Sequence, residues 1–424
     1  VIMSIKSISV LGLGYIGLPT ATILSDHFKV FGYDPVKEKI EKIKNGTLEI
    51  DEPGLKEFLD KALEEGRIEV SDRIHEADMY IICVGTPFND DKSCDLKYIK
   101  DACHDILKVI KKGDTVVLES TSPPRTTEDV VKPILEKSGL KVSEDIYLAH
   151  SPERVIPGNI LYELKNNHRV VGGVDTKSAE IVRDVYKTFV DAEVFTTDAT
   201  TAEVCKLLEN TFRDVNIALA NEMLKICDTL GVNVWELIEL ANKHPRVNVH
   251  TPGPGVGGHC ISVDPWFLVT ADKENSKLIH QARDINDSMP KFTADKIKKI
   301  VEKGSKIAIL GSSFKPNIDD FRESPITHLI ALLKDDYNVA VYDPFKNDQI
   351  LEFNELYDDI RPVVKGADLL VLGVNHGQFC FLDYKEIGKI MKKKNIFDTR
   401  NYIDREKVEA LGFNYYLLGS GELE

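Results

Sequence analysis

The chain has 424 residues, of which 42% are hydrophobic, so a mainly disordered protein is excluded and two or three domains are expected. The formal net charge of −15 argues against a nucleic-acid partner, which needs clustered Lys and Arg, but not against an anionic small molecule. The seven cysteines are odd in number and lack metal-ligand spacing, so we expect a reducing, cytoplasmic setting with neither disulfides nor a bound metal.

Short apolar strands alternate with charged helical stretches through the first half of the chain. The predicted strands are Ser7–Gly12, Lys29–Tyr33, Met79–Val84 and Thr115–Glu119. Stretches with helical period, such as Pro35–Lys44 and Leu96–Lys111, lie between them, and this alternation predicts βαβ units in a parallel sheet. No run reaches eighteen apolar residues, so we expect neither a membrane span nor a targeting signal.

The same order of elements returns in the second half. The predicted strands there are Lys306–Gly311, Asn338–Tyr342, Ala367–Val374 and Asn395–Asp398. Both halves carry Tyr-Asp-Pro after their second strand and Ala-Asp just before their third. We therefore predict an α/β protein with two Rossmann-like, doubly wound parallel-sheet domains.

Residues 200–230 have a different texture, with neither Pro nor Gly and with apolar residues close to the 3.6-residue period. This predicts one long central helix, capped by Asp198 and ended by Gly231, with a shorter helix at Val234–Ala241. Its broad apolar stripe is expected to pack either on a second copy of the chain or on the chain's own domains. The predicted domains are residues 1–197, a small helical domain at 198–300, and residues 301–424.

Gly12, Gly14 and Gly17 fit the pattern G-x-G-x-x-G between a predicted strand and a predicted helix, and Asp34 ends the next strand. The glycines allow a pyrophosphate to approach a helix N-terminus. A carboxylate at Asp34 accepts hydrogen bonds from ribose hydroxyls and repels a 2′-phosphate, so residues 1–197 are predicted to bind NAD rather than NADP. The second half lacks the second and third glycines of this pattern, so its sheet is expected to bind something other than a dinucleotide.

A glycine-rich loop delivers Cys260, and Asp264 follows four residues later. A thiolate is a strong nucleophile towards an aldehyde, and neighbouring glycines let a substrate carbon approach; an incidental cysteine in a flexible loop is the alternative. On the long helix, Lys206 and Asn210 share a face. A lysine beside the apolar stripe can stabilise an alkoxide or move a proton, whereas a solvated helix surface is the alternative.

Hydroxyls and cations follow several predicted strand ends, where ligands bind in open sheets. They are Thr86, Thr121, Arg154, Lys315, Arg322 and Arg400. The cations suit an anionic ligand such as a diphosphate, although an exposed salt bridge is the alternative for any one of them.

These motifs, in this order, resemble the UDP-glucose/GDP-mannose dehydrogenase family, whose members oxidise the C6 alcohol of a nucleotide sugar to a carboxylate with two NAD⁺. The matching segments are GLGYIGLP (12–19), CVGTP (83–87), ESTSPP (119–124), SPERVIPG (151–158), KLLEN (206–210), GPGVGGHCISVDP (253–265), FKPNIDDFRES (314–324) and DTRN (398–401). Within the family, residues 244–266 are most similar to members that act on UDP-N-acetyl-D-mannosamine; UDP-N-acetylglucosamine and UDP-glucose are the alternative substrates.

The resemblance implies a role for each matching residue. It implies Cys260 as the nucleophile, Lys206 as the acid/base and oxyanion residue with Asn210 beside it, and Glu153, Thr121 and Asp264 as residues that position or activate water. The implied NAD contacts are Gly12, Gly14, Tyr15, Ile16, Gly17, Asp34, Lys39, Thr86 and Thr121, with Lys39 where an arginine is more usual. The implied contacts to the UDP-sugar are Arg154, Val155, Lys206, Asn210, Arg213, His244, Arg246, Gly257, Lys315, Arg322 and Arg400.

The resemblance also implies a homodimer or higher homo-oligomer, in which His244 and Arg246 reach a neighbouring subunit's site. Two other classes of protein are weighed against this enzyme. An inactive NAD-binding scaffold would not need Lys206, Asn210, Cys260 and Asp264 together. A two-electron hydroxyacid dehydrogenase would need neither the thiol nor the second α/β domain.

Overall fold

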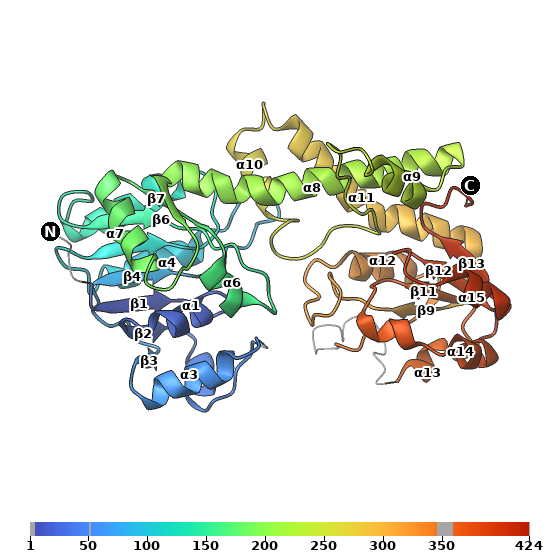
Figure 1. Ribbon diagram of the computed structural model, residues 1–424, viewed down its shortest axis with the longest axis horizontal. Helices are drawn as coiled ribbons and strands as arrows, with labels where there is room; N and C mark the ends of the chain where they lie inside the picture. Colours follow the sequence, from blue (N-terminus) through green and yellow to red (C-terminus); the bar gives the residue numbers. More distant parts are fainter. Residues whose placement is uncertain (1–4, 51, 346–358, 424) are drawn as a thin grey trace. The chain divides into compact units, whose positions relative to one another are not determined.

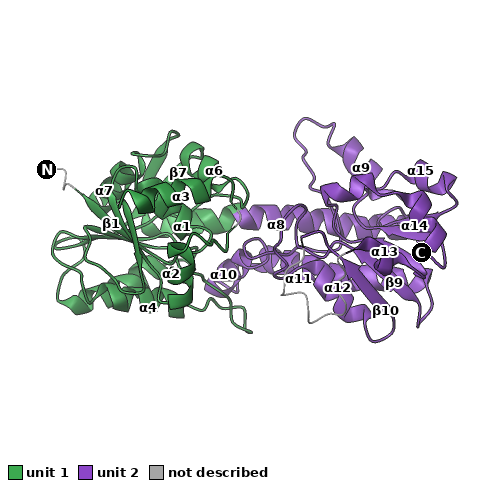
Figure 2. Ribbon diagram, turned by 90° about the horizontal axis from the view of Figure 1, so that it is seen from below, with its two compact units in different colours: residues 1–209 green, residues 210–424 purple. Residues whose placement is uncertain are grey.

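The computed structural model describes residues 5–50, 52–345 and 359–423. The chain divides into two compact units, residues 1–209 and 210–424, and the boundary falls within the long helix α8 (Ala199–Leu230) (Figure 2). Each unit is built on one β-sheet (Figure 1). The finer division into three domains, with boundaries at 198 and 301, stays a prediction.

Unit 1 contains an eight-stranded sheet in the order β3-β2-β1-β4-β5-β6-β7-β8. Its strands are β1 (Ser7–Leu11), β2 (Lys29–Tyr33), β3 (Ile68–Ser71), β4 (Met79–Ile82), β5 (Thr115–Leu118), β6 (Tyr147–His150), β7 (Arg169–Gly173) and β8 (Val194–Asp198). Its helices are α1 (Gly17–Leu24), α2 (Lys37–Lys44), α3 (Leu55–Glu64), α4 (Lys97–Ile106), η1 (Thr127–Val131), α5 (Lys132–Leu135), η2 (Glu136–Ser138), α6 (Ile160–Asn166) and α7 (Thr176–Tyr186). The four predicted strands of this half are confirmed, some ending one or two residues earlier.

Unit 2 contains a five-stranded sheet in the order β10-β9-β11-β12-β13, with parallel pairings as predicted. Its strands are β9 (Lys306–Leu310), β10 (Asn338–Tyr342), β11 (Leu369–Leu372), β12 (Asn395–Asp398) and β13 (Asn414–Leu417). Besides its part of α8, its helices are α9 (Val234–Ala241), α10 (Asp264–Ala271), α11 (Lys277–Ile300), α12 (Pro325–Leu333), α13 (Ile360–Val364), η4 (Gly377–Phe381), α14 (Tyr384–Ile390) and α15 (Arg405–Ala410).

The central strands of both sheets are buried on both faces, as their continuous apolar runs require. In β4, Met79 and Ile81 lie in one core of unit 1, whereas Tyr80 and Ile82 lie in the core on the opposite face. Strand β9 of unit 2 alternates between two cores in the same way. Across the described part of the chain, no helix combines the length and the hydropathy that a membrane span requires.

The pairing of β6 with β7 is antiparallel, which differs from the prediction of a parallel sheet throughout. His150 lies opposite Gly172, and Ala149 lies opposite Gly173. The connection after β6 does not cross back to the opposite end of the sheet, as parallel strands require. Strand β7 therefore starts at the end where β6 stops, and it runs antiparallel to β6. The first residue of β7, Arg169, therefore lies at the end of the sheet where the carboxyl ends of β1 to β6 lie.

The long helix is confirmed, and both of its predicted end signals are present. The carboxylate of Asp198 accepts a hydrogen bond from the Thr201 N–H at 2.8 Å, which satisfies one donor of the first turn. Gly231 has φ +69°, a left-handed conformation that glycine adopts without strain and that ends the helix.

A buried polar network joins α8 to α11 within unit 2. Arg283 is 1% exposed, and its guanidinium lies 2.6 Å from the carboxylate of Asp214. The Asn286 amide donates to the same carboxylate at 2.8 Å and accepts from Asn221 at 2.8 Å. Asn221 in turn accepts the N–H of Gly253 at 2.9 Å, so the network holds the start of the glycine-rich loop.

Replacing Arg283 by methionine is expected to lower the free energy of unfolding by about 3–5 kcal/mol, because the Asp214 carboxylate then stays buried without its cation. Chemical denaturation of the full chain measures this loss. The matched control is Lys291→Met on the same helix, whose ion pair with Asp295 is exposed and contributes less than about 1 kcal/mol. Equal losses in the two variants would contradict the expected importance of the network.

Candidate active site

The glycine turn after β1 is tightly packed at two positions and open at the third. A β-carbon on Gly12 (φ +92°) would lie 2.7 Å from the Cys83 carbonyl oxygen, and one on Gly17 would lie 1.7 Å from the Gly12 carbonyl oxygen. A β-carbon on Gly14 would have no atom within 4 Å. The packed glycines shape the turn, and the open one leaves room beside the N-terminus of α1 for a pyrophosphate. The turn therefore fits a dinucleotide.

Asp34 and Lys39, two residues predicted to contact NAD, lie together beside this turn. The Asp34 side chain is buried, and one of its carboxylate oxygens accepts the Leu13 N–H at 3.1 Å. The ammonium of Lys39 lies 3.1 Å from the same oxygen. The backbone contact fixes the carboxylate against the turn that would hold the pyrophosphate, where ribose hydroxyls can reach it.

Replacing Gly14 by alanine is expected to weaken NAD⁺ binding by about tenfold or more, because the new methyl group occupies the space through which the pyrophosphate approaches. Folding is not expected to change, since that methyl group meets no protein atom within 4 Å. Titration calorimetry with NAD⁺ measures the first effect, and thermal unfolding without ligand measures the second. An unchanged NAD⁺ affinity would show that the cofactor does not pass over Gly14.

The loops after β4 and β5 are tied together at two predicted site residues. The Thr86 hydroxyl donates to the carbonyl oxygen of Thr121 at 2.7 Å. At the start of η1, which follows the loop after β5, the N–H of Thr127 donates to the buried carboxylate of Glu203 on α8 at 2.8 Å. Burial raises the pKa of Glu203 to about 7. Glu203 was not predicted as a site residue, because nothing in its local sequence marks it as the anchor of a distant loop.

Glu153 and Lys206, two predicted catalytic residues, form a largely buried pair in unit 1. Their carboxylate oxygen and ammonium nitrogen are 3.8 Å apart, and the two side chains are 13% and 8% exposed. The other oxygen of Glu153 accepts the Val155 N–H at 2.8 Å. A carboxylate so placed can accept a proton from water, and the lysine can stabilise a developing negative charge.

A buried cluster that was not predicted lies close to Glu153. The Arg169 guanidinium lies 3.0 Å from Glu119, and the Tyr186 hydroxyl donates to the other Glu119 oxygen at 2.7 Å. Arg169 also donates to Ser151 at 3.1 Å, two residues before Glu153. Arg169 therefore joins the ends of β5 and β6, which is possible only because β7 starts at that edge of the sheet.

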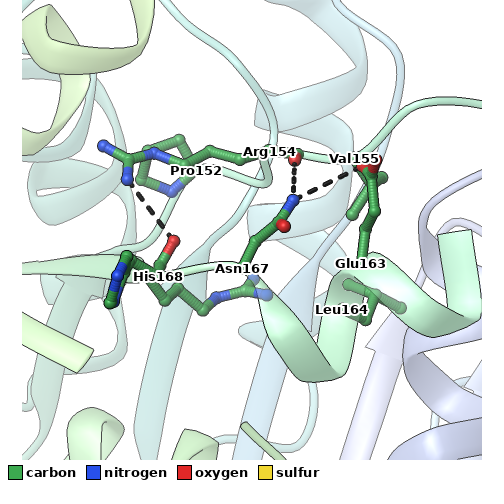
Figure 3. Close-up of a pocket in the computed structure, with 8 residues that line it drawn as sticks. Pro152, Arg154, Val155, Glu163, Leu164, Asn167 and His168 are labelled. Carbon is green, nitrogen blue, oxygen red and sulfur yellow. Dashed lines mark hydrogen bonds between the residues drawn. The ribbon is translucent and has the colours of Figure 1, made fainter. Parts of the chain in front are cut away.

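Arg154 and Val155 line a small pocket, although the charge of Arg154 is already paired. Its guanidinium contacts the Glu209 carboxylate and donates to the His168 carbonyl oxygen at 3.4 Å. The Asn167 amide donates to the Arg154 carbonyl oxygen at 2.8 Å (Figure 3). The lining residues are Pro152, Arg154, Val155, Glu163, Leu164, Asn167, His168 and Arg169.

In unit 2, three predicted catalytic residues lie around the N-terminus of α10. Cys260 is exposed, and its carbonyl oxygen accepts the Asp264 N–H at 2.8 Å in the turn that leads into the helix. The Asn210 amide donates to the Asp264 carboxylate at 2.6 Å, and both side chains are buried. Cys260 thus precedes a helix N-terminus, where negative charge is favoured, and Asn210 fixes the carboxylate of Asp264.

The glycine-rich loop packs against the segment 314–323 of the same unit. A β-carbon on Gly257 would lie 2.4 Å from the Glu323 carbonyl oxygen, and one on Gly258 (φ +90°) would lie 2.7 Å from the Phe314 ring. The N–H of Gly258 donates to the carbonyl oxygen of Arg322 at 3.1 Å. Only glycine allows so close an approach, so the loop that carries Cys260 rests on the loop that carries Lys315 and Arg322.

The predicted cations of unit 2 occupy different settings. Lys315 and Arg322 are exposed, and Arg322 forms a two-pronged ion pair with Asp320 at 2.6 and 2.9 Å. Arg400 donates to the Gly373 carbonyl oxygen at 2.9 Å. Desolvation lowers the pKa of Arg400 to about 10, which leaves it a cation at neutral pH.

Three further residues predicted to bind the substrate are exposed. Arg213 lies on α8, whereas His244 and Arg246 lie in the segment after α9. Two hydrogen bonds between Asn242 and Val249, at 2.7 and 3.1 Å, close the base of that segment. The roles of the three exposed residues stay predictions.

Comparison with known proteins gives three family-model matches along the chain. They are the NAD binding, central and UDP binding domains of the UDP-glucose/GDP-mannose dehydrogenase family, at residues 6–190, 200–288 and 308–405.

Similar full-length proteins are known from archaea and bacteria. The UDP-N-acetyl-D-mannosamine dehydrogenase of Methanocaldococcus jannaschii is 47% identical, with 98% of this chain and 97% of the relative covered. The NDP-N-acetyl-D-galactosaminuronic acid dehydrogenase of Ralstonia nicotianae is 43% identical over 96% of this chain and 98% of its own. The solved structure of the UDP-D-ManNAc dehydrogenase of Pyrococcus horikoshii has a TM-score of 0.92 at 42% identity, covering 98% of this chain and all of that one.

Proposed function

Because the chain belongs to the UDP-glucose/GDP-mannose dehydrogenase family and NAD is its cofactor, we propose that it oxidises UDP-N-acetyl-D-mannosamine at C6 to the corresponding uronate. The observation that carries the choice of sugar is the 47% identity, over nearly the whole chain, to a dehydrogenase named for that substrate. The Ralstonia relative favours an N-acetyl-galactosamine derivative as a second candidate. We place the reaction in the cytoplasm, consistent with seven cysteines that are all thiols.

A panel of UDP sugars separates these substrates. The chain is incubated with NAD⁺ and, in turn, the UDP derivatives of N-acetylmannosamine, N-acetylglucosamine, N-acetylgalactosamine and glucose. GDP-mannose is included as a nucleotide sugar with a different nucleobase. The proposal expects the highest kcat/KM with UDP-N-acetyl-D-mannosamine. A higher value with any other sugar contradicts the choice of epimer and leaves the family assignment intact.

The proposed chemistry assigns distinct tasks to the residues of the candidate site. When NAD⁺ is bound it supplies the oxidant, since two molecules in succession each accept one hydride from C6. The C6 hydroxyl loses its proton to Lys206 or to a water beside it, and the lysine stabilises the alkoxide. The Cys260 thiolate then adds to the aldehyde carbon: a C–S bond forms, the carbonyl π bond opens, and the oxygen takes back a proton from Lys206 or its water. The reactive intermediate is retained as a thiohemiacetal.

The second oxidation leaves a thioester on Cys260, and hydrolysis completes the cycle. Water adds to the thioester carbon, the C–S bond breaks, and the uronate and the thiolate are released. Glu153 or Asp264 accepts the proton of that water, with Thr121 positioning it. The buried Glu153–Lys206 pair supports Glu153 as the acceptor of this proton, and the Asn210–Asp264 hydrogen bond supports Asp264 in the same role.

The proposal includes a homodimer formed along α8. Within unit 2, the exposed apolar side chains of this helix are Phe212, Leu219, Ile226 and Leu230. Their spacing of seven, seven and four residues puts them on one face, as in a helix-packing seam. Light scattering is expected to give twice the chain mass of 47.6 kDa. A monomeric wild-type chain would contradict the dimer, and Leu219→Glu is expected to halve the mass of the wild-type assembly.

A further inference from the structure

Asp343 of unit 2 corresponds in position to Asp34 of unit 1, but it has a different partner. Each follows the second strand of its sheet, and each accepts an N–H from the turn after the first strand. Asp34 faces Lys39, which is partly exposed. Asp343 instead lies 3.0 Å from Nε2 of His376, and both side chains are fully buried. The carboxylate of unit 2 is thus occupied by a contact inside the protein.

The hydrogen bonds of His376 define which ring nitrogen carries the proton. Its Nδ1 accepts the N–H of Asn317 at 2.9 Å, so the hydrogen lies on Nε2 and is donated to Asp343. Burial alone would raise the pKa of Asp343, but the contact with His376 and the hydrogen bonds from the Ser312 and Phe345 N–H groups together outweigh burial and lower it. The imidazole ring is therefore fixed through both of its nitrogens.

The contact with Asn317 fixes the backbone on one side of Lys315. Asn317 has φ +62°, and its side-chain oxygen accepts the N–H of Gly377 at 2.8 Å. On the other side, the Ser313 hydroxyl donates to the carbonyl oxygen of Lys315 itself at 2.8 Å. Lys315 is thus part of a short backbone segment that two buried side chains hold by hydrogen bonds. Ser313 holds the carbonyl oxygen of Lys315, and His376 holds the N–H of Asn317.

We propose that His376 is a positioning residue for the diphosphate of the nucleotide sugar, because its contact with Asn317 holds Lys315 where that lysine binds UDP. This rests on the proposed function and on the contact with the UDP-sugar that the family resemblance implies for Lys315. A lysine on a fixed backbone loses less conformational freedom on binding than one on a flexible loop, so removing the contact weakens the complex. NAD⁺ binds in unit 1 and is not expected to respond.

The experiment measures two dissociation constants on the full-length chain by titration calorimetry, one for UDP and one for NAD⁺. His376→Ala and His376→Gln remove the acceptor for the Asn317 N–H and are expected to weaken UDP binding by about tenfold or more. His376→Asn places an amide oxygen near the Nδ1 position and is expected to stay within about threefold of wild type. In all three variants NAD⁺ binding is expected to stay within twofold of wild type. The matched control is His104→Asn, at an exposed histidine of unit 1, and it is expected to leave NAD⁺ binding unchanged to the same extent.

A second variant avoids the buried core. Asn317→Gly keeps the left-handed conformation accessible, removes the contact with Gly377 and gives the backbone beside Lys315 more freedom, so it is expected to fold and to weaken UDP binding by about threefold or more. With the UDP-sugar, the variants that bind UDP weakly are expected to raise KM and to leave kcat within twofold.

Three results would overturn the proposal: unchanged UDP binding in His376→Ala, an equal loss in His376→Asn and His376→Ala, or a parallel loss of NAD⁺ affinity. Absence of UDP binding to the wild-type chain would overturn this proposal and the proposed function together. UDP binding without oxidation of any UDP sugar would overturn the proposed function alone.

Discussion

Replacing Cys260 by serine is expected to lower uronate production by at least about 10³-fold, because serine is far less nucleophilic than a thiolate towards the C6 aldehyde. The variant should either stop before acid release or accumulate an ester on the enzyme. Steady-state turnover measures the first outcome, and intact-protein mass spectrometry after mixing with substrate detects the second.

The matched control for this substitution is Cys380→Ser. Cys380 is also an exposed thiol of unit 2, but it lies beside the Tyr402 hydroxyl, away from the glycine-rich loop in the sequence. Its replacement is expected to leave kcat within twofold of wild type. Uronate formation by Cys260→Ser at the wild-type rate would contradict a pathway that needs the thiohemiacetal and the thioester on Cys260.

Replacing Lys206 by methionine is expected to lower kcat by about 10²–10⁴-fold, the range for loss of a general acid/base. The ammonium lies 3.8 Å from Glu153, so its removal also leaves that carboxylate without its nearby cation. Single-turnover measurement of NADH formation separates the effect on the first oxidation from the effect on hydrolysis. We expect the first oxidation to be slowed, because the C6 alkoxide then lacks the lysine that stabilises it and that receives its proton directly or through a water.

Lys225→Met is the matched control on the same helix. Lys225 is half-buried and donates to Ser288 at 2.6 Å, so its loss tests the effect of removing a tethered lysine from α8. Its kcat is expected to remain within twofold of wild type. If Lys206→Met retained the rate of this control, Lys206 would be excluded as the residue that takes the hydroxyl proton.

Features that depend on neighbouring residues in the chain were predictable from the sequence. The glycine turn at Gly12–Gly17 and the helix Ala199–Leu230 follow from local spacing and from end signals such as Asp198 and Gly231. Asn210 and Asp264 were each predicted as catalytic from their own motifs, although the contact between them, across 54 residues, was not. In such cases each motif already contains the reactive side chain, and the fold brings the side chains of different motifs into contact.

Features that depend on distant partners were not predictable. Arg169 reads as an ordinary start to a strand, and its role follows from the antiparallel return of β7, which places it against Glu119. Glu203 and His376 are unremarkable in their local sequence, yet each is buried and holds the backbone of a loop that carries predicted site residues. One sequence reveals such positioning residues only after the fold is known.

The stoichiometry of NADH tests the central claim, a four-electron oxidation that passes through Cys260, most directly. A limiting amount of UDP-N-acetyl-D-mannosamine is converted to completion with excess NAD⁺, while NADH is followed by absorbance and the product is identified by mass spectrometry. We expect two NADH for each sugar consumed, with the uronate as the product. One NADH for each sugar, with the aldehyde as the product, would contradict it.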